Sequence, residues 1–262
     1  MTWSQSNSIV GNWSAVAISA LGQYASACLD GAGIYYSSNF GKTWLASDAE
    51  TNTTWNSIAV ASHGIHQLAC VDSKVYLSTN YGVSWSSVTI ASGKTWKFVE
   101  VSAKGNHMFA LATDALYMSS DYGSSWSEIT VDAFNTATNG IIKVNTNGDF
   151  RVLALNNLGL FVYSPRDGSA VWRKSNAPDN VDFTDLAISA TGQYQLLTID
   201  ASSQIYKSSD FGSTWSLTDS SANFWKSISV SSTGDDIMAI GGDASGNNLD
   251  IYYSKLEKGY TY

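Results

Sequence analysis

Short stretches of alternating apolar and small residues recur along this chain and predict β-strands. After Trp13, Val16 and Ile18 alternate with Ala15 and Ala17, which is the period of two that a half-buried strand shows. The same pair of apolar positions returns further along as Ile58/Val60, Val99/Val101, Ile142/Val144 and Ile228/Val230. No stretch has the periodicity of a helix, so the pattern predicts an all-β protein.

A glycine follows each of these first strands and predicts a tight turn into a second, apolar strand. The glycines are Gly22, Gly64, Gly105, Gly148, Gly192 and Gly234. A further turn leads to a third strand. The third strands are expected at Ile34–Ser37, Val75–Ser78, Leu116–Ser119, Ile205–Ser208 and Ile251–Ser254.

An eight-residue phrase follows four of the third strands and predicts the turn into a fourth strand. The copies occupy residues 37–44, 78–85, 119–126 and 208–215 and read SSNFGKTW, STNYGVSW, SSDYGSSW and SSDFGSTW. The Asp or Asn can accept hydrogen bonds from backbone N–H groups two residues on, the glycine permits a positive φ, and the Trp buries a large ring. The positions expected to shape the turn are Asn39, Gly41, Trp44, Asn80, Gly82, Trp85, Asp121, Gly123, Trp126, Asp210, Gly212 and Trp215.

The spacing of these markers divides the chain into six units of roughly 42 residues. A Trp opens four of the units, at Trp13, Trp55, Trp96 and Trp225. An acidic or amide residue marks the turn after each second strand, at Asp30, Asp72, Asp114, Asn157, Asp200 and Asp243. This period is that of four-stranded propeller blades. We therefore expect residues 1–262 to form a single six-bladed β-propeller with four antiparallel strands per blade, the blades starting near residues 13, 55, 96, 140, 183 and 225.

The two ends of the chain predict how the propeller ring closes. Thr2-Trp3-Ser4 precedes Trp13 at the spacing with which Thr214-Trp215-Ser216 precedes Trp225. The N-terminal segment thus has the pattern of a fourth strand without its blade, and the last unit has three clear strands. We expect residues 2–6 to complete the last blade and remove an open edge, with Tyr262 as a competitor for that place.

The repeated phrase resembles the Asp-box, or BNR repeat, Ser-x-Asp-x-Gly-x-Thr-Trp. Residues 208–215 match it in full, residues 119–126 have Ser for Thr, and the first two copies have Asn for Asp. The resemblance implies a propeller of the sialidase-like superfamily, in which the boxes are structural and lie away from the functional face. The face carrying the Asp30-type turns and the segments that lead into the opening Trp residues would then be the functional one.

Enzyme activity is disfavoured by the distribution of the charged residues. Sialidases hold the substrate carboxylate with three arginines from different blades, whereas Arg151, Arg166 and Arg173 all lie in the fourth unit. A glycosidase needs two carboxylates across a sugar. A catalytic pair should stand out as unrepeated, but the marker aspartates are repeated around the predicted ring. We expect no catalytic residues, with a glycoside hydrolase as the least favoured alternative.

A non-enzymatic, multivalent carbohydrate-binding (lectin-like) propeller is the function that these residues favour. Aromatic rings can stack on sugars and carboxylates can bind hydroxyl groups, and repetition would add avidity. The candidate ligand-binding residues are Trp13, Trp55, Trp96, Trp225, Asp30, Asp72, Asp114 and Asp200. The alternative for the Trp residues is a place in the core. The alternative function is a structural or assembly platform that binds other proteins, as in a virion, surface or multiprotein complex.

Charge and composition exclude several other classes. The net charge of −8 disfavours nucleic acid, and no apolar run is long enough to insert into a membrane. No signal peptide is visible at the start, and the polar composition is compatible with an extracellular or virion-associated protein. Cys28 and Cys70 occupy equivalent strand positions and are expected to be small buried residues rather than a disulfide. His63, His66 and His107 fit no metal-ligand spacing, so we expect neither a metal nor a cofactor.

Overall fold

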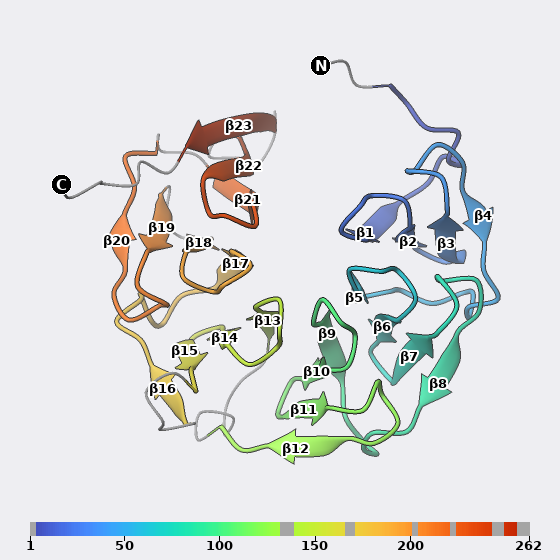
Figure 1. The fold of residues 1–262 in the computed structure, drawn as a ribbon, viewed down its shortest axis with the longest axis horizontal. Coiled ribbons are helices and arrows are strands. Elements are labelled where there is room, and N and C mark those ends of the chain that lie inside the picture. Colours follow the sequence, from blue (N-terminus) through green and yellow to red (C-terminus); the bar gives the residue numbers. More distant parts are fainter. Residues whose placement is uncertain are drawn as a thin grey trace. The chain divides into compact units, whose positions relative to one another are not determined.

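The computed structural model contains strands and no helix among the residues that it describes, which are 4–131, 139–165, 171–200, 204–220, 224–242 and 249–255. These strands form six antiparallel sheets (Figure 1). The prediction of an all-β propeller built from six antiparallel blades is confirmed. The chain divides into two compact units, residues 1–132 and 133–262, and each unit holds three of the sheets.

The first unit consists of three four-stranded sheets in which sequence neighbours pair. The first sheet has β1 (Trp13–Ile18), β2 (Ala25–Leu29), β3 (Gly33–Ser37) and β4 (Leu45–Ala46). The second has β5 (Ser57–Val60), β6 (Gln67–Val71), β7 (Lys74–Ser78) and β8 (Ser86–Val88). The third has β9 (Trp96–Val101), β10 (Met108–Ala112), β11 (Leu116–Ser119) and β12 (Ser127–Ile129). The first strands of neighbouring sheets, β1, β5 and β9, contact one another in that order.

The second unit repeats this arrangement. Its first sheet has β13 (Gly140–Val144), β14 (Arg151–Leu155), β15 (Gly159–Tyr163) and β16 (Trp172–Lys174). The next has β17 (Phe183–Ile188), β18 (Gln195–Ile199), β19 (Ile205–Ser208) and β20 (Ser216–Leu217). The last has three strands among the described residues, β21 (Phe224–Val230), β22 (Asp236–Gly242) and β23 (Asp250–Lys255).

The eight-residue phrase forms a turn, the octapeptide turn, in which the same backbone N–H groups donate to side-chain oxygens in all four copies. These bonds differ in one respect from the prediction. In the first copy, Asn39 Oδ1 accepts from the backbone N–H of Thr43, four residues on rather than two, at 2.9 Å. Ser37 Oγ accepts from the N–H of Gly41 at 3.0 Å. The N–H two residues on from Asn39 is that of Gly41, which donates to Ser37 Oγ instead. Phe40 and Gly41 both have positive φ. The positive φ predicted for the glycine is confirmed in every copy.

The Trp that ends each octapeptide belongs to the turn and not to the fourth strand. The indole Nε1–H of Trp85 donates to the carbonyl oxygen of Gly82 at 3.0 Å, and Trp44, Trp126 and Trp215 make the same bond. This bond folds the ring back over the turn. The fourth strands of these blades begin at the residue after the Trp, at Leu45, Ser86, Ser127 and Ser216.

The apolar core lies between neighbouring sheets of each unit. In the first unit, Trp55, Ile58, Tyr76 and Trp85 of the second sheet form one cluster with buried residues of the first, including Cys28. Cys28 and Cys70 are both free and buried, as predicted. Burial raises the pKa of both thiols, which makes them poor nucleophiles.

Glycine and aromatic residues at the first turns tie neighbouring sheets of the same unit together. A Cβ added to Gly64 would lie 2.7 Å from the Tyr24 ring, and one added to Gly192 would lie 2.4 Å from the Phe150 ring. The aromatic residue of the octapeptide in the next blade packs against that ring. Such pairs include Tyr81 on Tyr24 at 4.2 Å and Tyr122 on His66 at 4.9 Å between ring centroids. The first-turn glycine, the ring of the preceding blade and the aromatic residue of the octapeptide thus hold neighbouring blades together, and we call this group of residues the clamp.

His66 should make this clamp sensitive to acid. Burial, followed by the nearby His63, lowers the pKa of His66, so the folded protein binds its proton less readily than the unfolded chain does. Stability from this group is present above the ordinary histidine pKa of about 6.5 and is lost as pH falls below it. We expect the urea midpoint to decrease from pH 7.5 to pH 5. His66→Tyr, which copies Tyr24 and Tyr194, should reduce that decrease, and an equal decrease in the variant would contradict the assignment.

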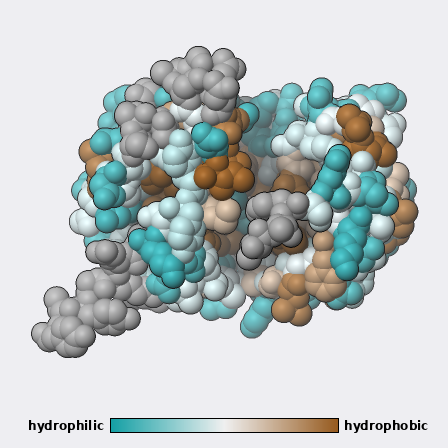
Figure 2. Space-filling model, turned by 90° about the horizontal axis from the view of Figure 1, so that it is seen from above, coloured by the Kyte–Doolittle hydropathy of each residue, from teal (hydrophilic) through white to brown (hydrophobic). Residues whose placement is uncertain are grey.

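Apolar side chains reach the surface at the first and last sheets. Val16 and Ile18 of β1 are 69% and 59% exposed, whereas Ile58, the counterpart of Val16 in β5, is buried. In the second unit, Ile251 and Tyr253 of β23 are 63% and 61% exposed. Figure 2 shows apolar side chains (brown) at the surface among hydrophilic ones (teal). Closure of the ring by residues 2–6 or by Tyr262 stays a prediction, because residues 1–3 and 256–262 lie outside the described residues.

Candidate functional site

The Trp residues predicted to bind a ligand lie mainly in the core. Trp55, Trp96 and Trp225 are at most 3% exposed. Each packs against a tyrosine of the third strand in its own sheet, with ring centroids between 4.9 and 5.5 Å apart: Tyr76, Tyr117 and Tyr252. Trp13 is half-buried against Tyr35 and Trp44. The three buried rings present no face on which a sugar could stack, so the alternative, a place in the core, describes them.

The aspartates predicted to bind a ligand lie at the surface, unlike the Trp residues. Asp30, Asp72, Asp114 and Asp200 are all exposed, at the turns between second and third strands. Asp114 forms an ion pair with Lys94 at 2.8 Å. Of the four, Asp72 lines a large surface hollow in the first unit. The marker residue Asp243 lies outside the described residues.

The Asp72 hollow has a volume of about 830 Å³ and a predominantly polar lining. Four segments of the first unit surround it: the turn after β2, the loop that enters the second sheet, the turn after β6 and the start of β9. Its lining residues are Gly31, Asn52, Thr53, Thr54, Asn56, Val71, Asp72, Ser73 and Lys97. Hydroxyl, amide, carboxylate and ammonium groups therefore meet in one open space.

Two side chains hold the carboxylate of Asp72 in the lining of this hollow. Its Oδ1 accepts hydrogen bonds from Asn56 Nδ2 and from Lys97 Nζ, each at 2.7 Å. Asn56 Nδ2 also donates to the carbonyl oxygen of Trp96 at 2.8 Å. The bond from Lys97, followed by that from Asn56, lowers the pKa of Asp72. The carboxylate is therefore charged at neutral pH, while its side chain stays 67% exposed.

Backbone hydrogen bonds between neighbouring sheets hold the rim. Gly31 N–H donates to the carbonyl oxygen of Thr53 at 3.1 Å, and Asn52 N–H donates to that of Gly31 at 3.0 Å. Trp96 N–H donates to the Asp72 carbonyl oxygen at 2.9 Å. These bonds join the three sheets of the unit at the hollow.

Lys97 and Asn56 are site residues that the sequence pattern did not single out. Lys97 is the extra residue of a β-bulge in β9, since Trp96 pairs with Ala112 and Phe98 with Leu111. A bulge interrupts the regular alternation of side chains along a strand. Lys97 therefore lies at the surface although its neighbour Trp96 is buried. Their position in the sequence was the available signal for a place at the site. Asn56 directly follows Trp55, and Lys97 directly follows Trp96.

The lining groups can donate hydrogen bonds to a polar ligand and accept them from it. Asp72 is the one carboxylate among the lining residues, and a glycosidase needs two across the scissile bond. Lowering of the Asp72 pKa also works against a role as proton donor. No group of three or more His, Cys, Asp or Glu side chains suited to a metal occurs in the described part of the chain.

The described residues contain no helix of the length and apolar character that crossing a bilayer requires.

Comparison with solved structures identifies the class of fold, a β-propeller. An ancestral GH74 enzyme aligns with 95% of this chain at a TM-score of 0.71 and 17% identity, using 39% of its own length. The GH74 xyloglucanase from Xanthomonas campestris aligns with 90% at 0.69 and 14% identity, using 44% of its length. A GH74 enzyme from Niastella koreensis aligns with 91% at 0.70 and 14% identity, again using 44%.

The chain thus spans less than half the length of each of these enzymes. At such low identity the likeness shows the fold alone. Scans against family models and curated proteins gave no match.

Proposed function

We propose that this chain is a non-catalytic Asp-box propeller that binds carbohydrate in the Asp72 hollow. The observation that carries this proposal is the held carboxylate: Asn56 and Lys97 both bind Oδ1 of Asp72, which leaves Oδ2 outside both bonds and able to accept from sugar hydroxyl groups. The lining Thr and Ser hydroxyls and the Asn amides supply further donors and acceptors. A volume of about 830 Å³ is in the range of ligand sites.

Two features support binding without catalysis. The hollow has a single lining carboxylate, whose pKa is lowered rather than raised. Arg151 also has a structural role. Arg151 lies over the ring of Tyr163, with its guanidinium carbon 4.5 Å from the centroid, and its Nε donates to the carbonyl oxygen of Gly148. A structural role of this kind takes the guanidinium away from substrate binding.

A neutral oligosaccharide is the ligand class that fits the charges of this hollow. Lys97 and Asp72 form an ion pair at 2.7 Å, so the two site charges offset each other and neither sign of ligand is favoured. Since the solved structures with this fold include a xyloglucanase, xyloglucan oligosaccharides are the first to test. Glycoprotein glycans are the second class.

Replacing Asp72 by Asn should weaken oligosaccharide binding by about tenfold or more, because a hydrogen bond to a charged group contributes roughly 1.5–3 kcal/mol. Asp114→Asn is the matched control, since Asp114 has the same exposed, lysine-paired setting on the next blade but does not line the hollow. A glycan array followed by titration calorimetry measures both. Equal loss in the two variants, or no loss in Asp72→Asn, would refute the proposed site.

A protein-binding platform is the second candidate function. The exposed apolar side chains of β23, Ile251 and Tyr253, favour it, because such side chains side by side on a sheet mark many interaction surfaces. A blank glycan array with folded protein, together with specific capture of a partner that Ile251→Ser abolishes, would favour this function over carbohydrate binding.

A further inference from the structure

A pocket of about 160 Å³, which we call the last-sheet pocket, lies between the last two sheets of the second unit. An apolar protein cavity of roughly this volume, about 150 Å³, holds a benzene ring. The segment after β20 contributes Asp219 and Ser220 to the lining, and the last sheet contributes the rings of Trp225 and Tyr252. Part of the lining belongs to β23, which is an edge strand among the described residues. The pocket therefore has room for one aromatic side chain beside an open strand edge.

The corresponding place between the first and second sheets of the other unit is filled by an octapeptide Trp. This residue, Trp85, is 7% exposed. Its core cluster includes Ile34, Ala49, Trp55, Ala69 and Tyr76. The last-sheet pocket is lined by the residues at the same repeat positions, which are Ile205, Ser220, Trp225, Ala239 and Tyr252. The Trp–Tyr pair packs alike in both sheets, with ring centroids 5.2 Å apart in the second sheet and 4.9 Å apart in the last. The pocket thus has the lining that surrounds an octapeptide Trp elsewhere in this chain.

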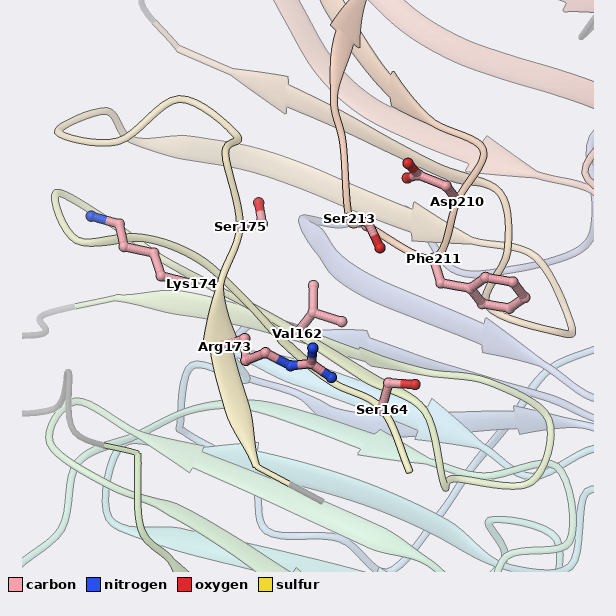
Figure 3. A pocket seen from close by; sticks show the side chains of 9 residues that line it. Val162, Ser164, Arg173, Lys174, Ser175, Asp210, Phe211 and Ser213 are labelled. Carbon is pink, nitrogen blue, oxygen red and sulfur yellow. The ribbon is translucent and has the colours of Figure 1, made fainter. Parts of the chain in front are cut away.

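The backbone of an octapeptide Trp is held by a side chain from the preceding sheet. Trp85 N–H donates to Asp48 Oδ1 at 2.8 Å. In the second unit, Trp215 N–H donates to Asn176 Oδ1 at 3.1 Å. Figure 3 shows the surroundings of this second bond, where the segment that carries Ser175 faces the octapeptide turn after β19. Both acceptors lie in the segment directly after a fourth strand.

Asp219 occupies the place of these acceptors ahead of the last sheet. Around the first acceptor, Ala49 N–H donates to Ser47 Oγ at 3.2 Å. Around Asp219, Ser220 N–H donates in the same way to Thr218 Oγ1 at 3.3 Å. Because Asp219 also lines the last-sheet pocket, its carboxylate is in place to accept from the N–H of an aromatic residue that enters the pocket.

The first described residues of the chain have the local structure that follows a fourth strand. Ser8 N–H donates to Ser6 Oγ at 3.4 Å, which repeats the turn around Asp219. Asn7, between them, donates its N–H to the carbonyl oxygen of Lys42 in the first octapeptide at 3.4 Å. The residues ahead of this turn therefore correspond in sequence to a fourth strand.

We propose that the last-sheet pocket binds the indole ring of Trp3 from the same molecule. Thr2-Trp3-Ser4 has the sequence of Thr214-Trp215-Ser216, where the preceding sheet begins its fourth strand. Trp3 N–H donates to the Asp219 carboxylate, as the octapeptide Trp residues do to their acceptors. The ring packs against Trp225 and Tyr252, which adds buried aromatic surface to the sheet.

Residues 4–6 then add to the open edge of β23 as the fourth strand of its sheet. The pairing of β7 with β8, in which Leu77 lies opposite Ser86, gives the register and places Ser4 opposite Tyr253. The added strand pairs the exposed edge of β23 and so removes a site for association with other chains. No residue of the Asp72 hollow takes part, so this docking does not depend on carbohydrate binding.

The aromatic residues near the other end of the chain have the wrong spacing for this pocket. An octapeptide Trp lies seven residues after the Ser that begins the phrase. Counted from Ser254, that position is Thr261, with Tyr260 and Tyr262 on either side. Successive side chains of an extended strand point to opposite faces, so a shift by one residue aims the ring away from the pocket.

Disulfide formation in the full chain tests the proposed register. Opposed residues of antiparallel strands have Cα atoms about 4.5–5.5 Å apart, which is within the range of disulfides, and both native cysteines are buried. We expect Ser4→Cys/Tyr253→Cys to give a cross-linked monomer on mild oxidation, seen on a non-reducing gel and by mass spectrometry of the linked peptides. Ser4→Cys/Lys207→Cys is the matched control and should stay unlinked. Lys207 is exposed and has the repeat position of Tyr253 in the preceding sheet, but Ser216 already pairs with it.

Trp3→Ala should open the pocket to a peptide added in solution. A synthetic peptide of residues 1–8 should bind the full-length Trp3→Ala protein at least about tenfold more tightly than the native protein, in which the tethered Trp3 competes. Asp219→Ala, added to that variant, should weaken peptide binding about tenfold, and a peptide with Ala in place of Trp3 should not bind. Tyr262→Ala should leave the protein as unreceptive as the native one. Titration calorimetry measures each affinity.

Four results would overturn this docking. One is no cross-link in Ser4→Cys/Tyr253→Cys, or an equal yield in the control. A cross-linked dimer would show that a second copy supplies Trp3. Absence of peptide binding to Trp3→Ala would remove the pocket as the receptor. Peptide binding that appears in Tyr262→Ala instead would assign the pocket to the C-terminal segment.

Discussion

Gly82→Ala should lower the free energy of unfolding by about 3 kcal/mol, whereas Gly93→Ala should lower it by only about 1 kcal/mol. Both glycines have positive φ, 81° and 71°, so both variants carry the cost of a left-handed alanine. The two positions differ in the space available for a Cβ atom. A Cβ on Gly82 would lie 2.5 Å from Ser26 Oγ and 2.8 Å from Gln67 Oε1, while a Cβ on Gly93 meets nothing within 4 Å.

The contact at Gly82 is costly because it falls on a buried polar bond between two sheets. Ser26 Oγ donates to Gln67 Oε1 at 2.6 Å, and both residues are fully buried. Moving either group breaks a hydrogen bond that water cannot replace. Urea unfolding of the two variants measures the difference directly. Equal losses would show that the octapeptide glycine is needed for its φ alone and not for the approach of one blade to the next.

Trp55→Ala should cost about 3–5 kcal/mol, which is the usual range for truncating a buried Trp. The indole ring is 1% exposed and packs on Tyr76 at 5.2 Å between centroids. Trp55→Phe should cost clearly less. It keeps an aromatic ring on Tyr76 and removes the indole Nε1–H, which is buried and has no hydrogen-bond acceptor among the described residues.

Thermal and urea unfolding of the two Trp55 variants, with sugar binding measured on the folded fraction, decides between a core and a ligand role. We expect Trp55→Phe to keep its affinity for the oligosaccharide that the native protein binds. A Trp55→Ala protein of native stability that has lost that affinity would show instead that the ring is a binding platform.

The repeats made the fold predictable. Each octapeptide contains its own turn chemistry, so Ser37, Asn39 and Gly41 specify a local structure without help from distant residues. The alternation at Val16 and Ile18 identified a first strand in the same way. Such signals lie within a few residues of one another, and a period of roughly 42 residues then multiplies them into six sheets.

The site was only partly predictable, because its geometry depends on neighbouring blades. The sequence placed Asp72 at an exposed turn, but its partners Asn56 and Lys97 come from a preceding loop and from the next sheet. Trp55 and Asp72 are both suitable sugar-binding residue types. Only packing against Tyr76 shows that the ring is covered while the carboxylate is open. The bulge that turns Lys97 outward depends on strand pairing, which no local pattern encodes.

The most direct test of carbohydrate binding at the Asp72 hollow is an amide chemical-shift titration of the isotope-labelled protein with a xyloglucan oligosaccharide. We predict saturable shifts for the amides of Asn56, Asp72 and Lys97 and of the loop at residues 52–54, with residues 171–175 unaffected. Two results would contradict the account. One is saturable shifts elsewhere in the protein with none at these positions. The other is the absence of any shift, both with this oligosaccharide and with the glycan that binds best on the array.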